Sequence, residues 1–319
     1  MLLEEPGSPP IILVSPLKDL LARRPHVRSE RIRFRDSDSV DVEAFVLLPE
    51  GWSKDQGRLP LLAVIHGGPQ SFDEPAFQFD ESYWAGLGYL VLQVNYRGST
   101  SYGEAFTRSI QGVWGPKEHD DLMCAVNEGV KRGPADPDRL YVTGFSYGGI
   151  MTNWAVGHTD RFRAGASEHG LWDYVSAFGT DDCHLDWQDE YGMPWQNRKA
   201  YEASSPMSGA AYIRTPLLIT AGEDDWRCPP SQGEQLFLTL KKRGVPTELV
   251  IDPGEHHDVG RPSRAIDRLR RITNWLSRYG GPSDPNVGVK GGERTAVDGP
   301  ETRAKTRETE TALTPGSDD

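Results

Sequence analysis

"YVTGFSYGGI", residues 141–150, joins three local patterns that together decide the fold. Its first residues favour a strand, a G-x-S-x-G motif centred on Ser146 follows, and the residues after Gly148 favour a helix. The motif alone is weak, because chance produces it in roughly one chain in five of this length. A strand, a sharp turn and a helix in direct succession are typical of a nucleophile elbow, which holds a reactive serine at its tip. The alternative is a plain tight turn at Ser146.

The residues around Ser146 suit a nucleophile. Gly144 and Gly148 lack side chains, so neighbouring segments can approach the bend closely. Ser146 would start the helix, where free backbone N–H groups, that of Tyr147 among them, stabilise negative charge. A serine hydroxyl is a poor nucleophile at neutral pH, so a histidine must take its proton and an acid must orient that histidine. In this architecture the partners follow in the order Ser, Asp, His.

Long apolar runs predict a parallel sheet that is covered on both faces. Residues 61–66 and 89–96 are such runs. Further strands are expected at 140–145, 163–169, 216–222 and 247–252. Helical apolar spacing lies between or after them, at 119–133, 231–244 and 264–279. Residues 31–35 and 40–46 alternate instead, which indicates an antiparallel hairpin with one solvated face. The pattern predicts a mostly parallel, doubly wound α/β sheet with an N-terminal antiparallel hairpin.

The two ends of the chain differ in composition from its middle. Residues 1–30 contain five prolines and no sustained period, so we expect an extension or linker there. Residues 281–319 are polar and predict a disordered tail, which leaves residues 31–280 as the folded domain. Within that domain, residues 171–212 are rich in aromatic and acidic side chains and interrupt the alternation. They predict an excursion over one end of the sheet.

The overall composition excludes several classes of function. The net charge of -12 repels polyanions and argues against nucleic acid or an anionic membrane as the main partner. The apolar run at residues 11–14 is too short for a signal or a membrane span, so we expect a cytoplasmic protein.

Three separated cysteines fit reduced thiols. The cluster "DDCHLD", residues 181–186, lacks a fixed ligand spacing, so we expect no metal and no cofactor, and a solvated wall of the cleft instead.

Acids and histidines that suit Ser146 follow the last two predicted strands. Asp224 and Asp225 come after one strand, and His256 and His257 come after the next. The carboxyl ends of parallel strands meet at one edge of the sheet, where α/β proteins place their sites. Periodicity does not choose within either pair. His66 precedes the serine, and the remaining histidines are assigned to helices, helix ends or the excursion: His119, His158, His169 and His184.

The glycine-rich loop "VIHGGP", residues 64–69, follows an earlier strand. Such loops present backbone N–H groups that stabilise a tetrahedral oxyanion, so we expect a donor here to act with the N–H of Tyr147. His66 is expected to shape this loop through a hydrogen bond rather than to transfer protons. Arg97 and Arg227 either contact a substrate carbonyl or carboxylate, or brace loops through acidic neighbours.

Linked motifs run in order from about residue 30 to about residue 279. They are "HGGP", "NYRGSTSYGEAF", "GVWGPKEHDDL", "DPDRLYVTGFSYGGIMTNWAVGHTDRFRAGAS", "SPMSGAAYIRTPLLITAGEDDWRCPPSQGEQL" and "PGEHHDVGRP". Together they resemble the catalytic domain of the prolyl oligopeptidase family, most closely its acylaminoacyl-peptidase branch. The resemblance implies an α/β-hydrolase fold for residues 31–280.

The resemblance also implies roles for single residues. The family's GxxDxR pattern falls on Asp225, and its PGExH pattern falls on His257, which selects one member of each pair. The catalytic residues are then Ser146, Asp225 and His257. Gly68 is implied as an oxyanion donor beside Tyr147, because the tyrosine that some members carry at the position of His66 is absent here.

The family normally places a β-propeller before the hydrolase domain, and the segment before residue 31 is too short for one. We therefore expect a standalone hydrolase domain or a truncated reading frame. An open site that also accepts esters or larger substrates would result, together with self-association through the face that a propeller would cover.

These observations predict a serine hydrolase that cleaves acylaminoacyl or oligopeptide bonds through an acyl-enzyme. The alternative with the same mechanism is a carboxylesterase on small acyl esters with weak amidase activity. A third alternative is a non-catalytic binding module on the same fold, which would predict damage to a triad position. All three positions are intact.

Overall fold

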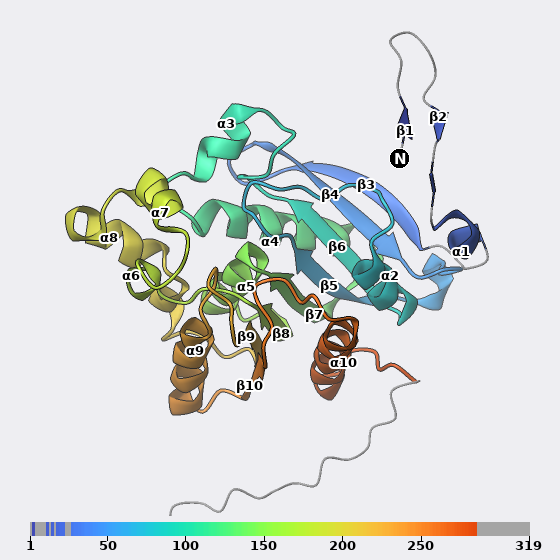
Figure 1. Cartoon of the computed structure of the whole chain (residues 1–319). Helices are drawn as coiled ribbons and strands as arrows, with labels where there is room; N and C mark the ends of the chain where they lie inside the picture. The colour runs from blue at the N-terminus through green and yellow to red at the C-terminus, as the bar shows by residue number, and fades with distance from the viewer. Residues whose placement is uncertain (1, 4–10, 13, 16, 23–26, 286–319) are drawn as a thin grey trace, which may run out of the picture. The chain divides into compact units, whose positions relative to one another are not determined.

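The computed structural model describes residues 2–3, 11–12, 14–15, 17–22 and 27–285 (Figure 1). The chain divides into two units, Met1–Asp284 and Pro285–Asp319, and the sheet, the helices and the candidate site all belong to the first. Most of the expected tail and much of the expected N-terminal extension lie outside the described residues. Within the extension, β1 (Leu2–Leu3) pairs antiparallel with β2 (Ile11–Ile12), and a short helix α1 (Lys18–Ala22) comes after them.

An eight-stranded sheet organises the described part of the chain (Figure 1). Its strands are β3 (Arg28–Arg35), β4 (Asp41–Leu48), β5 (Leu59–Ile65), β6 (Leu90–Asn95), β7 (Ala135–Phe145), β8 (Phe162–Glu168), β9 (Leu217–Gly222) and β10 (Thr247–Asp252). Their order is β10-β9-β8-β7-β5-β6-β4-β3. The six from β10 to β6 are parallel, and β4 and β3 add an antiparallel edge. The predicted sheet and its N-terminal hairpin are confirmed.

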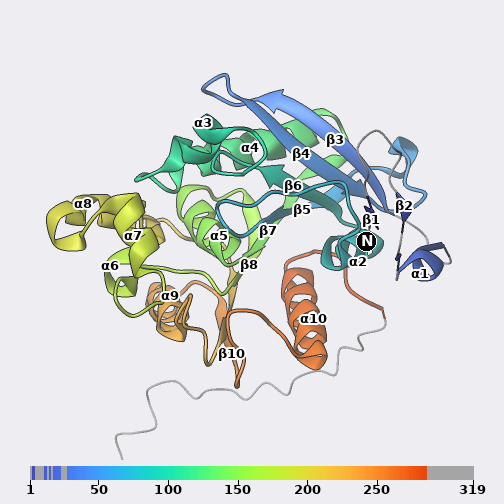
Figure 2. The same ribbon diagram turned by 45° about the horizontal axis from the view of Figure 1, so that its top comes forward.

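Helices cover both faces of the sheet, as a doubly wound sheet requires. The longer helices are α2 (Phe79–Gly86), α4 (Pro116–Lys131), α5 (Tyr147–His158), α9 (Pro230–Arg243) and α10 (Pro262–Arg278). One apolar core lies under α4, α5 and α9, and a second lies under α2 and α10. Figure 2 shows α2 and α10 on the same side of the sheet. The shorter elements are η1 (Lys54–Gln56), α3 (Glu104–Thr107) and η2 (Arg108–Ile110).

The N-terminal hairpin differs from its prediction on one strand. Buried and exposed side chains alternate from Arg31 to Arg35 of β3, as expected, but β4 is buried from Val42 to Leu48. The reason is that β4 lies between β3 and β6, with residues of α2 and α4 nearby. Alternation in sequence therefore identified the strand, while its neighbours decided how much of it was covered.

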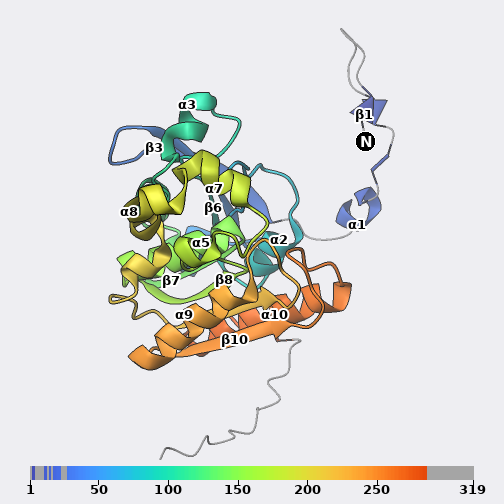
Figure 3. The same ribbon diagram turned by 60° about the vertical axis from the view of Figure 1, so that its left-hand side comes forward.

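The predicted excursion forms a cap of short helices. These are α6 (Tyr174–Ala177), α7 (His184–Tyr191), α8 (Pro194–Ser204) and η3 (Pro206–Gly209), and Figure 3 shows α6, α7 and α8 gathered together. Their buried aromatic rings, with Trp187 and Tyr191 among them, pack against Trp114. No helix in the described ranges has both the length and the apolar character that crossing a bilayer requires.

Candidate active site

Ser146 occupies a strained turn between β7 and α5. Its backbone has φ of 60° and ψ of -119°, in the region that favours glycine. The flanking glycines are necessary, because a Cβ on Gly148 would lie 1.9 Å from the carbonyl oxygen of Ile65, and one on Gly144 would lie 2.6 Å from Gly148. The strand, turn and helix predicted from the motif are therefore present, and the nucleophilic role of Ser146 stays a prediction. Such strain is typical of functional sites.

Ser146, His257 and Asp225 form a hydrogen-bonded chain. The Oγ of Ser146 lies 2.8 Å from Nε2 of His257, and Nδ1 of His257 lies 2.9 Å from Oδ2 of Asp225. Asp225 follows β9, and His257 lies in the loop between β10 and α10. The structure places Asp224 and His256 elsewhere, with the ring of His256 exposed and its Nδ1 3.0 Å from the backbone oxygen of Asp224.

Asp225 is held by more donors than His257 alone. Its side chain is completely buried, and Oδ1 accepts the backbone N–H groups of Arg227 and Cys228 at 2.9 and 2.8 Å. Oδ2 also faces Nδ1 of His169 at 2.9 Å. Burial by itself would raise the pKa of Asp225, but hydrogen bonds from His169, His257 and Cys228 outweigh it and hold the pKa well below its usual range. Asp225 is therefore an anion at neutral pH.

His169 is a site residue that the sequence prediction missed. It was assigned to a helix, a helix end or the excursion, but it directly follows β8, and its backbone N–H donates to Thr220 at 2.9 Å. The available signal was its position at the carboxyl end of a predicted strand, the rule that had already selected the candidate acids and histidines. No recognised motif includes it.

The predicted oxyanion donors line the same cavity as Ser146. This cavity has a volume of about 400 Å³ and includes Gly68, Ser146 and Tyr147 in its wall. The "HGGP" loop lies against the elbow, since a Cβ on Gly67 would come 3.5 Å from Cβ of Ser146. The cap supplies another part of the wall, which includes buried Trp187, exposed Asp186 and Asp189, and half-buried Glu190.

Tyr147, which lines the cavity, and His66 are each held by neighbouring groups. The hydroxyl of Tyr147 donates to the buried carboxylate of Glu118, which also accepts the N–H of Gly115 at 3.1 Å. The ring of His66 stacks on Tyr96 and lies within hydrogen-bond distance of the Gly67 backbone oxygen. Burial lowers the pKa of His66 to about 4, so the ring is neutral at physiological pH. This environment fits the predicted loop-shaping role.

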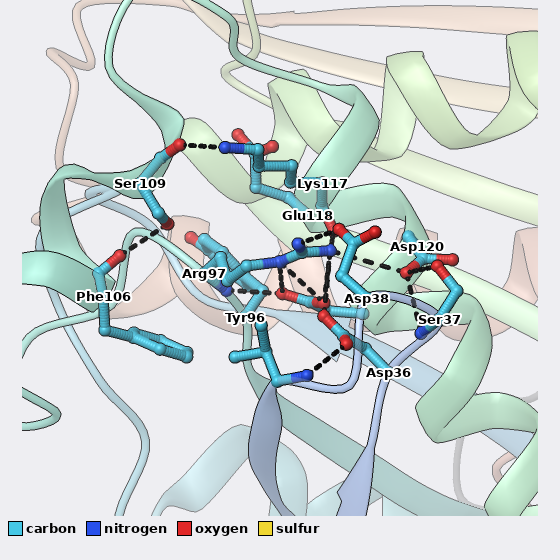
Figure 4. Close-up of polar contacts among 12 residues, drawn as sticks. Asp36, Ser37, Asp38, Tyr96, Arg97, Phe106, Ser109, Lys117, Glu118 and Asp120 are labelled. Carbon is cyan, nitrogen blue, oxygen red and sulfur yellow. Dashed lines mark hydrogen bonds and ion pairs between the residues drawn. The ribbon is translucent and has the colours of Figure 1, made fainter.

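The two arginines considered from the sequence differ in their surroundings. Arg97 is buried, and its guanidinium pairs with Asp36, Asp38 and Asp120 (Figure 4). It also pairs with Asp121, and it is not among the residues that line the cavity. It braces the turn of the N-terminal hairpin against α4. Arg227 does line the cavity, and its guanidinium pairs with Asp182. Bracing is therefore observed for both side chains.

Two groups of potential metal ligands occur among the described residues. One is His169, Asp225 and His257, and the other is Asp36, Asp38 and Asp120. In the first group the ligand atoms already face one another in hydrogen bonds, and in the second they face the guanidinium of Arg97. The residues of "DDCHLD" are in neither group. These contacts account for both clusters without an ion.

The sheet, the elbow and the hydrogen-bonded serine, histidine and aspartate define an α/β-hydrolase fold with a serine-hydrolase arrangement. The chain belongs to the prolyl oligopeptidase family, whose sequence model matches residues 75–283. It is 40% identical to the uncharacterized peptidase YuxL of Bacillus subtilis strain 168 over 257 residues, which are 78% of this chain and 39% of that protein. It is 34% identical to the acylamino-acid-releasing enzyme of Arabidopsis thaliana over 239 residues, 71% of this chain and 31% of that protein.

A solved structure shows the same fold. The acylaminoacyl peptidase of Pyrococcus horikoshii superposes with a TM-score of 0.81 at 26% identity, over 88% of this chain and 46% of that one. This chain therefore spans less than half the length of these relatives, and the match covers their catalytic region. The predicted family, the α/β-hydrolase fold and the class of serine-type peptidase hydrolases are confirmed.

Proposed function

We propose that this chain is a serine peptidase that cleaves acylaminoacyl or oligopeptide bonds through an acyl-enzyme. The observation that carries the proposal is the continuous path from the Oγ of Ser146 through His257 to Asp225, which opens into a cavity. A carbonyl carbon placed against Ser146 would lie beside the backbone of Gly68 and Tyr147. The relatives that are named as acylaminoacyl peptidases favour this substrate class.

Each residue has a defined role in the proposed reaction. The Oγ of Ser146 bonds to the substrate carbonyl carbon while Nε2 of His257 takes its proton, and the N–H groups of Gly68 and Tyr147 stabilise the oxyanion. His257 then gives the proton to the departing amine as the C–N bond breaks. Water then attacks the carbonyl carbon of the acyl-enzyme while Nε2 of His257 takes its proton. The bond to Oγ of Ser146 breaks, His257 returns the proton to Oγ, and the carboxylic acid is released. Asp225 keeps Nδ1 of His257 protonated and stabilises the imidazolium.

The experiment that tests this proposal compares two substrates and four proteins. We would measure kcat/KM for a short acyl p-nitrophenyl ester and for an N-acetylated amino-acid p-nitroanilide. Ser146→Ala and His257→Ala should each lose about 10⁴-fold or more on both substrates. His256→Ala is the matched control, since its ring is exposed and makes no contact with Ser146, and it should stay within about threefold of wild type.

The outcomes separate the candidate activities. Serine-dependent turnover of the anilide supports the peptidase, whereas turnover of the ester alone would replace it with a carboxylesterase. Absence of turnover on both would favour a binding module. A cytoplasmic location, the absence of nucleic-acid and membrane partners, and the domain boundaries at residues 30 and 280 stay predictions from the sequence. Self-association stays a prediction from the family resemblance.

A further inference from the structure

Two histidine rings converge on one oxygen of Asp225. Nδ1 of His169 and Nδ1 of His257 each lie 2.9 Å from Oδ2. His169 is separated from Asp225 by 56 positions, and its side chain is only 1% exposed. The mechanism described above requires His257 but gives no role to a second imidazole. The position of His169 therefore calls for a separate explanation.

The backbone at His169 is strained and tightly enclosed. Its φ is 50°, in the left-handed region that non-glycine residues seldom adopt. The neighbouring Gly170 packs so closely on α5 that a Cβ there would come 2.6 Å from the backbone carbon of Gly149. The ring of His169 lies against Phe145, with 4.8 Å between ring centroids. Strain persists where the surroundings impose it, and it is concentrated at functional sites.

The ring of His169 has one polar partner on the described part of the chain, which is Asp225. Its Nε2 is buried without a hydrogen-bond partner there. A neutral ring that is protonated at Nδ1 leaves Nε2 as an unpaired acceptor, whereas a doubly protonated ring would bury an unpaired N–H. Burying an unpaired polar atom is unfavourable, and an apolar side chain would avoid that cost. An apolar residue at this position would, however, lose the contact with Asp225.

We propose that His169 is a positioning residue for the candidate triad, with Nδ1–H donating to Oδ2 of Asp225. The inference rests on the proposed function. Backbone N–H groups hold Oδ1 of Asp225 and His169 holds Oδ2, so the carboxylate is fixed at both oxygens and keeps one direction for His257. The donation also withdraws part of the negative charge that His257 meets when it becomes an imidazolium.

The charged and titratable groups around His169 and Asp225 come from five places in the fold. Asp225 follows β9, His257 follows β10, Ser146 lies at the elbow, and Asp252 ends β10, where Arg264 approaches it at 3.6 Å. Because Asp225 is the group that joins both rings, removing one donor must change the other contact. Without His169, Asp225 would present more charge to His257 and would be less well oriented.

The test uses two substitutions with opposite hydrogen-bonding properties. His169→Phe keeps a ring against Phe145 and removes the donor. His169→Asn places an amide N–H close to the position of Nδ1, and asparagine tolerates a positive φ. The measurements are kcat, KM and the pH dependence of kcat/KM on the p-nitrophenyl ester, together with Tm for each variant.

We expect His169→Phe to lower kcat by about ten- to a hundredfold, with KM within about threefold. The lost hydrogen bond is one to an ionised group, and without it Asp225 is less well oriented toward His257. The midpoint of the acid limb of kcat/KM should move to higher pH, since Asp225 would then stabilise the imidazolium more strongly. His169→Asn should recover kcat to within about threefold of wild type. A structural role alone would lower Tm in both variants and would leave the midpoint unchanged.

A second measurement is independent of turnover. Proton NMR of the wild-type protein should show two downfield imidazole N–H resonances from the rings bound to Asp225, and His169→Phe should remove one. A wild-type kcat and midpoint in His169→Phe, or an unchanged pair of resonances, would overturn the proposal. If wild type shows no Ser146-dependent turnover while the resonances behave as expected, the proposed function fails and the contact of His169 with Asp225 stands.

Discussion

Asp225 and Asp121 are two aspartates with completely buried side chains and opposite pKa shifts. Burial raises the pKa of Asp121 to about 7, although Arg97 contacts it, and a hydrogen bond with Asp36 adds to the rise. Burial acts in the same direction on Asp225, yet its hydrogen bonds hold its pKa well below the usual range. The same residue type is therefore stabilised as an anion in one place, whereas in the other its pKa is shifted toward the neutral acid.

The difference lies in how many acids share the available donors. Asp225 receives two imidazoles and two backbone N–H groups, and none of these brings a competing carboxylate. Asp121 shares the guanidinium of Arg97 with Asp36, Asp38 and Asp120 (Figure 4). Burial penalises every anion, so the ratio of donors to acids decides which carboxylate keeps its charge. The Asp225 group lies beside Ser146, whereas the Arg97 group joins the turn of the N-terminal hairpin to α4.

Of the substitutions that test this comparison, Asp225→Asn should have the largest effect, and that effect is on kcat. We expect kcat to fall by about 10⁴-fold with the fold retained, because an amide no longer keeps Nδ1 of His257 protonated. Asp121→Asn is the matched control, with the same substitution in an equally buried side chain, and its kcat should stay within about threefold of wild type. Steady-state kinetics and circular dichroism would check both. If Asp225→Asn keeps a tenth of the wild-type kcat, the proposed role of Asp225 is wrong.

The sequence predicted the regular parts of this molecule because their signals are local. Apolar runs located β5 and β6, and the pattern around Ser146 predicted both the turn and the helix after it. β7 begins at Ala135 rather than near residue 140, because Ala135 pairs with Leu59 before the register shifts and regular pairing resumes at Leu140. The polar residues 136–139 between them give no apolar signal for a strand. The choice of Asp225 and His257 within their pairs came from family motifs, since spacing alone left both pairs open.

The parts that the sequence did not predict depend on contacts between distant segments. His169 lies 56 positions from Asp225, and no periodicity connects them. Arg97 lies 59 positions from Asp38, so its bracing role stayed one of two alternatives until the fold joined the two segments. Local patterns predict elements, but the charge balance of a buried group depends on which elements meet.

Arg97→Met should have the next largest effect, and on stability rather than on chemistry. Removing a guanidinium that is 4% exposed leaves several carboxylates without their cation, so we expect the free energy of unfolding to fall by about 3–5 kcal/mol. The activity per folded molecule should stay within about threefold, because Arg97 does not line the cavity. Urea unfolding and active-site titration would measure the two quantities.

A matched control for Arg97→Met lies on the hairpin whose turn Arg97 braces. Arg35 pairs with Asp41 at 3.2 Å, but both side chains are more than 70% exposed. Arg35→Met should therefore change the free energy of unfolding by less than about 1 kcal/mol. Equal destabilisation by the two substitutions would show that the buried cluster around Arg97 adds nothing beyond an exposed ion pair.

Asp121→Asn should have the smallest effect, on the pH dependence of stability. The carboxyl of Asp121 has an ordinary pKa of 3.8 and one of about 7 in the folded chain, so between these values the folded state holds a proton that the unfolded state has lost. Its contribution to stability is complete below about pH 4 and is lost as the pH rises through about 7. The free energy of unfolding of Asp121→Asn should thus fall less steeply than that of wild type from pH 5 to 7, by at most about 1.4 kcal/mol per pH unit.

Urea unfolding at several pH values would measure this difference, with Asp41→Asn as an exposed control on the hairpin. Asp225 contributes with the opposite sign, because a lowered pKa gives stability above the ordinary value that is lost as the pH falls. The two aspartates should therefore act in separate pH ranges, Asp225 in acid and Asp121 near neutrality. If the free energies of unfolding of wild type and Asp121→Asn change in parallel from pH 5 to 7, Asp121 is already ionised in that range. Arg97 would then stabilise four anionic carboxylates, and the contrast with Asp225 would be wrong.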